Sequence, residues 1–257
     1  MNEREKLEVL KAAVDGLDRA VDNWTKVGHL MKKAIVMDSI SNEAYASTES
    51  VIPGHPLIEE GRPEVDEFVA LVVDMRKSSD RLKSRERFPG LQDGFHRVYY
   101  ETSALLPALA QTALQKDGHV TEYLGDGVLI LFKVNTEDRV ETVRKAYRAA
   151  ANCVDISRVI VNDLLSERFQ LPPLHIGAGL SMSQALVTLV GIPGNMQPKA
   201  IGQCVWEASK LSDGYNKVHV AKALREAWPS VKGGSLRFKQ LPDSTKHDVK
   251  GFAVVKA

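Results

Sequence analysis

The run Phe68-Val-Ala-Leu-Val-Val-Asp74-Met75 is the clearest structural signal in this sequence. Its six consecutive apolar residues have the length and composition of a buried β-strand. A carboxylate follows directly, and a charge at the end of a buried strand is costly unless a partner compensates it. Asp74 therefore indicates either a simple turn or helix cap, or a position where a bound cation pairs with the carboxylate.

A second acidic residue lies in a tight turn. Residues 119–134 have the pattern of two strands joined at Gly125-Asp126-Gly127, because glycine tolerates the backbone angles that turns need. A lone Gly-Asp-Gly is also a common hairpin turn. Two carboxylates brought together can hold two magnesium or manganese ions about 3.5–4 Å apart, as in phosphoryl transfer. Asp74 and Asp126 together thus make a two-metal site a specific hypothesis.

Helical and strand patterns alternate along the rest of the chain. Helices are expected at residues 3–35, 91–116, 137–168 and 203–225, and further strands at 174–181, at 186–192 and near the C-terminus. This order predicts an α/β or α+β fold in which helices cover a sheet. Residues 1–66 would form an N-terminal helix and a linker, and residues 67–257 the main domain. The N-terminal helix either packs on its own domain or mediates dimerisation.

Composition excludes several classes of function. With 44% hydrophobic residues, 26% charged residues and a net charge of +1, the chain resembles a soluble globular protein without a broad basic surface. Nucleic acid polymers and anionic membranes are therefore not expected partners. The sequence has no apolar run long enough to span a bilayer and no signal-peptide core at its start, and Cys153 and Cys204 lack metal-ligand spacing. A cytoplasmic location is expected.

Five segments, in unbroken order, resemble motifs of the class III adenylate and guanylate cyclases. Phe68–Met75 resembles the first metal motif of that family, and Glu122–Ile130 resembles the second. The other three resemble a central strand, a strand–helix segment and a C-terminal lysine loop, at Leu174–Gly179, Pro198–Leu211 and Val249–Gly251. The resemblance implies an α+β fold with a ferredoxin-like core. It also implies an enzyme that closes a nucleoside triphosphate into a 3′,5′-cyclic monophosphate.

The resemblance assigns roles to individual residues. Asp74 and Asp126 would hold two divalent cations, Mn²⁺ or Mg²⁺, together with the backbone carbonyl of Met75. Backbone amides of residues 76–79 would meet phosphate oxygens, and Lys250 would bind the terminal phosphates. The substrate-binding candidates near the phosphates are Arg76, Lys77 and Lys250. Active sites of this family lie between two subunits, so a homodimer with two composite sites is expected.

Three positions depart from the family. The transition-state Asn and Arg of the family correspond to Trp206 and Lys210, and its strand arginine corresponds to His175. Lys210 still offers a cation to phosphate, although without the bidentate geometry of arginine. Trp206 cannot replace an amide that orients the ribose, so it is either a core residue or a residue that shapes the active site.

The positions that would read the base also differ. Glu122 stands where adenylate cyclases have lysine, and Lys199 stands at the second base contact. Glu122 can accept a hydrogen bond from a ring or exocyclic N–H, while Lys199 can donate to a carbonyl or ring nitrogen. Uracil offers a ring N–H between two carbonyls, so this pair of residues fits it. The same pair could also serve cytosine or guanine. A tryptophan that intrudes into the pocket would favour a base with a single ring.

This combination resembles the pyrimidine cyclases of Pycsar antiphage defence, which make cyclic UMP or cyclic CMP for a separate effector protein. The resemblance implies a uridylate cyclase that converts UTP to cyclic UMP and diphosphate. Two alternatives remain open from the residues: a guanylate or adenylate cyclase, and a catalytically inactive nucleotide sensor with a cyclase fold.

Overall fold

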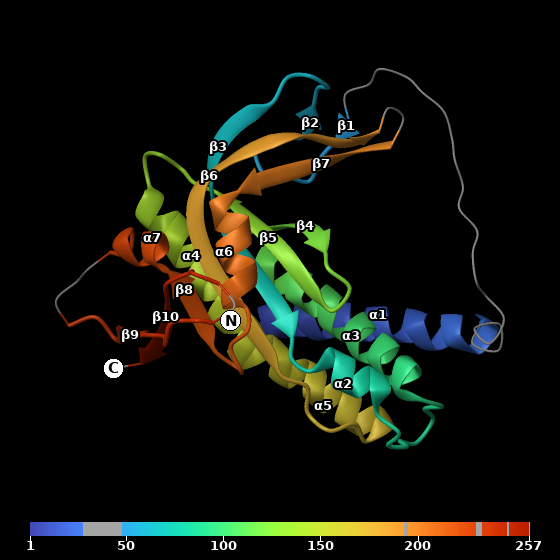
Figure 1. Ribbon diagram of the computed structural model, residues 1–257. Coiled ribbons are helices and arrows are strands. Elements are labelled where there is room, and N and C mark those ends of the chain that lie inside the picture. Colours follow the sequence, from blue (N-terminus) through green and yellow to red (C-terminus); the bar gives the residue numbers. More distant parts are fainter. Residues whose placement is uncertain (28–47, 193–194, 230–232, 246, 257) are drawn as a thin grey trace.

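A twisted sheet of eight strands forms the centre of the molecule (Figure 1). The computed structural model describes residues 1–27, 48–192, 195–229, 233–245 and 247–256. Strand order is β4-β5-β3-β6-β8-β10-β9, and β7 pairs with β6 outside this path. The strands are β3 (Glu64–Met75), β4 (His119–Tyr123), β5 (Gly127–Lys133), β6 (Ile176–Ile192), β7 (Asn195–Gly202), β8 (Val218–Ala221), β9 (Leu236–Gln240) and β10 (Gly251–Lys256). A separate small hairpin consists of β1 (Thr48–Glu49) and β2 (Leu57–Ile58).

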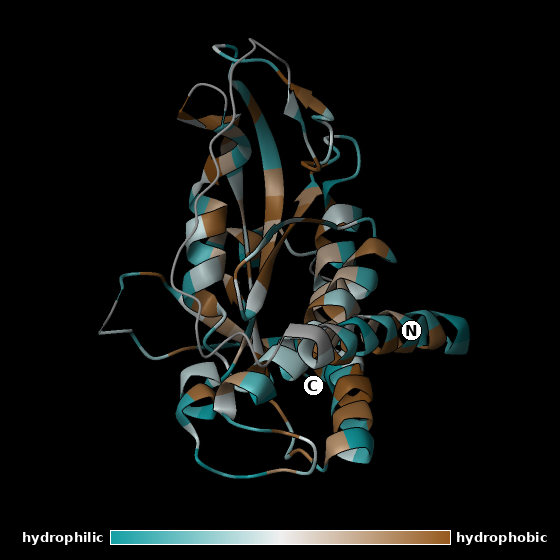
Figure 2. Ribbon diagram, turned by 90° about the vertical axis from the view of Figure 1, so that its right-hand side faces the viewer, coloured by the Kyte–Doolittle hydropathy of each residue, from teal (hydrophilic) through white to brown (hydrophobic). Residues whose placement is uncertain are grey.

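Helices cover both faces of this sheet. The helical segments are α1 (Glu3–Val27), α2 (Ser78–Lys83), α3 (Gly94–Leu114), α4 (Arg139–Asn152), a π-helical turn (Cys153–Ser157), α5 (Arg158–Phe169), α6 (Gln203–Leu211) and α7 (Lys222–Glu226). Figure 2 shows hydrophilic residues on the outer sides of the helices, with hydrophobic residues along the sheet and on the helix sides that pack on it. This arrangement confirms the expected α+β architecture.

The central position of β3 in the sheet explains why polar residues do not alternate with apolar ones in the run from Phe68 to Val73. It pairs antiparallel with β5 on one side and with β6 on the other, so its backbone groups are satisfied within the sheet. Val69, Leu71 and Val73 belong to the hydrophobic cluster on one face. Phe68, Ala70 and Val72 belong to the cluster on the opposite face, beneath α6. Because both faces are covered, every position of the run must be apolar.

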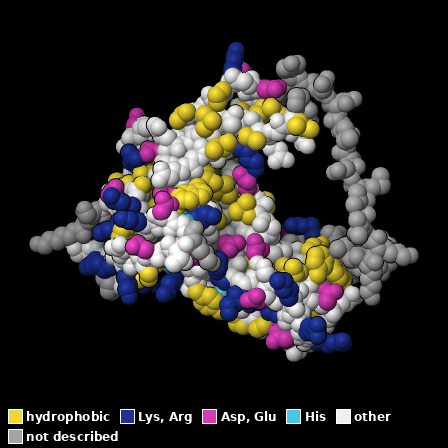
Figure 3. All heavy atoms as spheres, in the orientation of Figure 1, with side chains coloured by type: hydrophobic (Ala, Val, Ile, Leu, Met, Phe, Trp, Pro, Cys, Tyr) yellow, Lys and Arg dark blue, Asp and Glu magenta, His cyan; other side chains and the backbone are white. Residues whose placement is uncertain are grey.

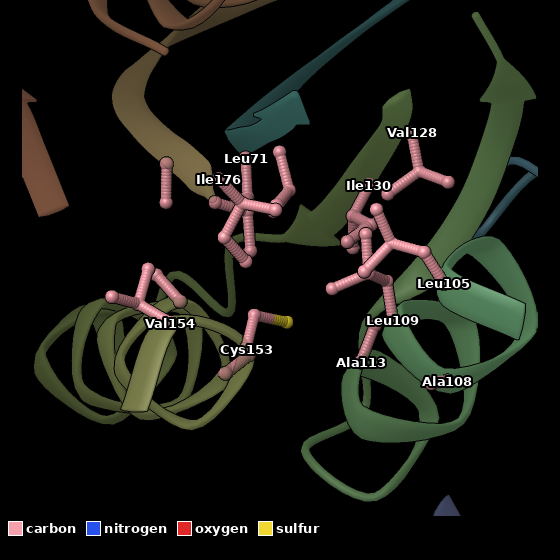
Figure 4. Packing of buried hydrophobic residues seen from close by; sticks show 14 of the residues in the cluster. Leu71, Leu105, Ala108, Leu109, Ala113, Val128, Ile130, Cys153, Val154 and Ile176 are labelled. Carbon is pink, nitrogen blue, oxygen red and sulfur yellow. The ribbon is translucent and has the colours of Figure 1, made fainter. Parts of the chain in front are cut away.

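The larger hydrophobic cluster lies between the sheet and the helices α1, α3, α4 and α5. Figure 4 shows a part of it, in which side chains of α3 meet strand residues such as Val128 and Ile130, with Cys153 close by. Cys153 is fully buried, and burial raises the pKa of its thiol to about 12. That environment suits a packing residue rather than a reactive nucleophile.

The N-terminal helix packs on its own domain. Val9, Ala13, Leu17 and Ala20 are buried against α3, at the spacing expected for one face of a helix. Gly16 faces α3 so closely that a β-carbon there would lie 2.1 Å from the carbonyl oxygen of Ser103. The helix is described as far as Val27, and the expected continuation over residues 28–35 lies outside the described residues.

Three sequence-based expectations need correction. The helix expected at 137–168 is interrupted by the π-helical turn at Cys153–Ser157, where the Ser157 hydroxyl donates to the carbonyl of Asn152. The two strands expected at 174–181 and 186–192 form the single strand β6, which pairs with β3 over Ile176–Val187 and with β7 over Ala185–Ile192. The helix expected at 203–225 is divided, because β8 lies within it.

Candidate active site

Asp74 and Asp126 lie side by side at one end of β3. Asp74 is opposite Gly127 of β5, and the amide of Met75 donates to the carbonyl of Asp126 across 3.1 Å. A β-carbon at Gly127 would come within 2.6 Å of the carbonyl oxygen of Val73 and 3.2 Å of Asp74 Oδ1. Only glycine therefore allows the turn that carries Asp126 to approach Asp74 this closely.

The surroundings of Asp74 disfavour the charged form of its carboxylate. Burial, followed by the neighbouring Asp126 carboxylate, raises the pKa of Asp74 to about 6, against the opposing effect of Arg76. The guanidinium Nη1 of Arg76 donates to Asp74 Oδ2 across 2.9 Å. Two carboxylates held together at partial burial form the arrangement that a divalent cation relieves.

These oxygen donors fit magnesium or manganese better than a softer metal. Among the described residues, no group of three or more His, Cys, Asp or Glu is arranged to hold a metal. The protein would therefore supply the carboxylates of Asp74 and Asp126 and the carbonyl of Met75, and substrate phosphates and water would complete the shell. Magnesium commonly binds in this way, through one or two carboxylates and the substrate.

A basic hollow of about 300 Å³ opens next to Asp74. It is lined by Arg76, Lys77, Asp80, Arg81, Ser84, Glu86, Arg97, Pro173, His175 and Tyr215. Three predicted substrate-binding residues, Arg76, Lys77 and His175, thus meet in one place. The amide of Arg76 already donates to the His175 carbonyl across 2.7 Å, which leaves the amides of residues 77–79 as the candidates for phosphate contacts.

His175 is fixed on two sides. Its Nδ1 lies 2.8 Å from Asn216 Nδ2, and its ring stacks on Tyr215 with 4.2 Å between the ring centroids. Burial lowers the pKa of His175, and nearby basic residues act in the same direction. The ring is therefore expected to be neutral at pH 7, so His175 does not add to the positive charge of this hollow.

A second hollow, of about 380 Å³, lies on the Asp126 side. Its lining consists of Ser78, Ser79, Leu82, Phe95, Val98, Tyr99, Thr102, Gly125 and Asp126. The start of α2 separates this hollow from the basic one. Lys77 directly precedes α2 and has left-handed backbone angles, φ 59° and ψ 33°, which allow the chain to turn sharply after β3.

The two predicted base-reading residues contact each other within one chain. Lys199 Nζ lies 2.9 Å from Glu122 Oε2, although Glu122 comes from β4 and Lys199 from β7. Each side chain remains partly exposed. The pair can therefore turn toward a ligand that offers a hydrogen-bond donor next to an acceptor.

Trp206 and Lys210 lie on α6, and Lys250 directly precedes β10. Trp206 is 45% exposed, so it is not a core residue of this chain. Among the described residues, no hydrogen bond or ion pair joins Lys210 or Lys250 to Asp74, Asp126 or the Glu122–Lys199 pair. Within a single chain, Lys210 and Lys250 are thus exposed and not paired with the two carboxylates.

Arg81 and Glu101 are site-supporting residues that the sequence analysis missed. Glu101 is fully buried, and its Oε1 accepts from Arg81 Nη1 across 2.5 Å and from Arg97 Nε across 2.9 Å. Arg81 Nη2 also donates to the carbonyl of Pro173, two residues before His175. These bonds tie α2 to α3 and to the chain that leads into β6. The detectable signal was an acidic residue on the apolar side of the predicted helix at 91–116.

Comparison with known proteins identifies the fold. No protein-family model and no curated protein matches the sequence. The crystal structure of the guanylyl cyclase Cya2 matches with a TM-score of 0.60 and 18% identity, covering 75% of this chain and 93% of that chain. The adenylyl cyclase CyaB from P. aeruginosa matches with a TM-score of 0.60 and 15% identity, covering 76% and 97%.

A third match is the guanylate cyclase domain of RhGC from Catenaria anguillulae, crystallised in complex with GTP. It has a TM-score of 0.53 and 14% identity, and covers 75% of this chain and 98% of that chain. The chain therefore has the fold of the class III nucleotidyl cyclases, as the motifs predicted. No helix among the described residues is long and apolar enough to cross a membrane.

Proposed function

We propose that this protein is a nucleotidyl cyclase that converts UTP into 3′,5′-cyclic UMP and diphosphate. The observation that carries the proposal is the approach of Asp74 and Asp126 at the end of β3, within a cyclase fold. A nucleotide sensor would have no need for two adjacent carboxylates, one of which, Asp74, has a raised pKa. The two carboxylates repel each other, and bound divalent cations would relieve this repulsion. The arrangement therefore favours a metal-dependent enzyme over a sensor.

The chemistry divides between the ions and the protein. Two bound cations would lower the pKa of the ribose 3′-hydroxyl and offset the charge of the phosphates. The 3′-oxygen forms a bond to the α-phosphorus, its proton passes to water, and the bond to the leaving diphosphate breaks. Arg76 and Lys77, with Lys250 and Lys210, would hold the phosphates in line and stabilise the charge that develops.

Base selection would rest on Glu122 and Lys199. With 2.9 Å between their charged atoms, the two side chains can bind adjacent positions of one base. Glu122 accepts from uracil N3–H, and Lys199 donates to the neighbouring carbonyl. Trp206, exposed on α6, would narrow the pocket against a purine. Because guanine also presents an N–H beside a carbonyl, a guanylate cyclase is the second candidate.

A homodimer would complete each site. Figure 3 shows hydrophobic side chains gathered over the arm that β7 forms with the end of β6. The exposed apolar residues of this arm are Leu186, Val190, Ile192 and Ile201. A second copy of the chain is the proposed partner, since burying such side chains favours association. The partner would bring its Lys210, Trp206 and base-reading pair toward Asp74 and Asp126 of the first chain.

The biological role proposed here follows from the resemblance to the Pycsar cyclases. Cyclic UMP would act as a second messenger in antiphage defence and would activate a separate effector protein. The enzyme would work in the cytoplasm, where nucleoside triphosphates are abundant.

The proposal is tested by incubating the purified protein with Mn²⁺ and ATP, GTP, CTP or UTP separately, with identification of the products by mass. Cyclic UMP should dominate. If cyclic GMP dominated, the protein would still be a nucleotidyl cyclase, but a guanylate cyclase and not a pyrimidine cyclase. Absence of any cyclic product, from protein shown to be folded and dimeric, would favour the nucleotide sensor.

The two-metal role has its own test. Asp74→Ala and Asp126→Ala should each abolish turnover while the circular dichroism spectrum is retained. Asp22→Ala is a matched control, because Asp22 is exposed on α1 and far along the chain from both carboxylates. Full activity in either of the first two variants would contradict the proposed metal ligands.

A further inference from the structure

A further hollow, larger than the two beside Asp74 and Asp126, lies away from the candidate active site. It has a volume of about 720 Å³ and opens between α4, α7 and β9. Its lining is Arg144, Tyr147, Arg148, Arg225, Glu226, Trp228, Pro229, Gly234, Ser235, Leu236, Arg237 and Phe238. None of these residues lines either of the hollows beside Asp74 and Asp126. The volume lies in the range of sites for small molecules.

Positive charge dominates this lining, with four arginines and a single glutamate. Figure 3 shows Lys and Arg side chains gathered over α7 and β9, in the left part of the view. Arg144 and Arg148 lie one helical turn apart on α4, and both lie 3.9 Å from a Glu141 oxygen. That distance is long for an ion pair, so a closer anion can compete for both guanidinium groups.

The other two arginines are held in place. The Arg225 guanidinium lies over the Phe252 ring, 4.3 Å from its centroid. Arg237 Nη1 donates to the carbonyls of Gly234 and Leu236. Since these contacts fix the planes of the two groups, less side-chain entropy is lost when an anion binds.

Aromatic rings form the remaining wall. Trp228 meets Tyr147 edge to face, with 4.9 Å between the ring centroids, and meets Phe238 with 5.2 Å. All three rings line the hollow together with the arginines. A planar heteroaromatic ring packs well on such a wall, while an attached phosphate can reach the guanidinium groups.

We propose that this hollow is a second ligand site, which binds a nucleoside phosphate separately from the candidate active site. The base would lie against Trp228 and the phosphate between Arg144 and Arg148. The site does not depend on the cyclase proposal, because it needs neither the metal ions nor the carboxylates that hold them.

The test is calorimetric titration of the full chain with UMP, GMP and ribose 5-phosphate, in EDTA to exclude metal-dependent binding. At least one of the two nucleotides should bind saturably. Arg144→Ala/Arg148→Ala should weaken that binding about tenfold for each arginine removed. The control Arg4→Ala/Arg19→Ala removes two exposed arginines from another helix, α1, and should leave the affinity unchanged.

The aromatic wall is tested by Trp228→Leu and by the conservative Trp228→Phe. The Leu variant should weaken nucleotide binding without affecting the binding of ribose 5-phosphate. The Phe variant, which keeps an aromatic ring, should restore nucleotide binding. Absence of saturable nucleotide binding, or equal losses in the two arginine double variants, would overturn the site. So would a loss of the same binding in Lys199→Ala, because it would place the nucleotide at the base-reading pair. Equal affinity for ribose 5-phosphate and both nucleotides would overturn the role of the ring.

Discussion

Lys77 occupies a backbone conformation that suits glycine better than lysine. Its left-handed angles occur where β3 ends and α2 begins, and no side-chain hydrogen bond caps the helix there. We expect Lys77→Gly to be more stable than Lys77→Ala by about 1 kcal/mol, because only glycine adopts these angles without steric cost. Urea denaturation of the two variants measures the difference. Equal free energies of unfolding would show that the backbone relaxes.

His96 predicts a pH dependence of stability. It is buried, its ring stacks on Trp24 with 3.9 Å between centroids, and its Nε2 has no hydrogen-bond partner in the described part of the chain. Burial lowers the pKa of His96, although Asp93 opposes this effect. The unfolded chain, with a histidine pKa of about 6.5, therefore binds more protons than the folded chain just below that pH.

The contribution of His96 to stability is thus present at neutral pH and is lost as the pH falls below about 6.5. Between pH 7 and pH 5, the free energy of unfolding should fall less in His96→Phe than in the wild type. The difference should correspond to at most about one proton, the one that the unfolded wild-type chain binds at His96. His119→Phe is the control, since His119 is exposed on β4. A His96→Phe profile that parallels that of the wild type would contradict the assignment.

At the level of residues, the sequence predicted the neighbourhood of the site but not its supports. The apolar run and the Gly-Asp-Gly turn placed Asp74 and Asp126 at adjacent strand ends, although their role as metal ligands stays a prediction. The Arg81–Glu101 contact joins residues from separate helices and could not be derived from local spacing. Exposure of Trp206 was equally undetermined, because a tryptophan at helical spacing fits a core as well as a surface.

Among the elements, α1 is held by an unusually close approach to α3. In an exposed helix, Gly16→Ala would stabilise the protein by about 1 kcal/mol. Here the added β-carbon would lie 2.1 Å from the Ser103 carbonyl oxygen and 2.9 Å from Pro107 Cγ. We therefore expect a net loss of about 1–3 kcal/mol, as in an overpacked core.

Thermal unfolding measures this loss. Asp15→Ala, an exposed neighbour on the same helix, should change the melting temperature little or raise it slightly. A Gly16→Ala variant at least as stable as the wild type would mean that α1 shifts without cost.

The element boundaries show where periodicity stops being informative. Strand β3 and the β4–β5 hairpin were predicted because burial on both faces and a glycine turn leave direct marks in the sequence. Strand β6 was read as two strands because the apolar pattern weakens at Ser181, the last residue of the first expected strand, and is interrupted at Ser183 and Gln184. Ser181 is nevertheless buried, and its hydroxyl donates to Glu207 across 2.5 Å. Such a distant partner for a polar residue has no local signature.

For the whole molecule, the proposed sharing of each site between two subunits makes a quantitative prediction. A chain with Asp126→Ala and a chain with Lys210→Ala should each be inactive. After subunit exchange, each mixed dimer would contain one intact site. With random pairing, activity should recover to about a quarter of the wild-type value. Mixed dimers that are confirmed by mass and remain inactive would count against sites shared between subunits.

The ion pair between Glu122 and Lys199 has a consequence for how such an enzyme changes over evolutionary time. Exchanging the two residues would preserve their mutual attraction, so the fold should tolerate Glu122→Lys with Lys199→Glu. The exchange would, however, reverse the order of acceptor and donor presented to a base. Uracil and cytosine differ by that same reversal at neighbouring ring positions. Because the codons of glutamate and lysine differ only in their first base, the proposed uridylate cyclase lies a short mutational path from its cytidylate counterpart.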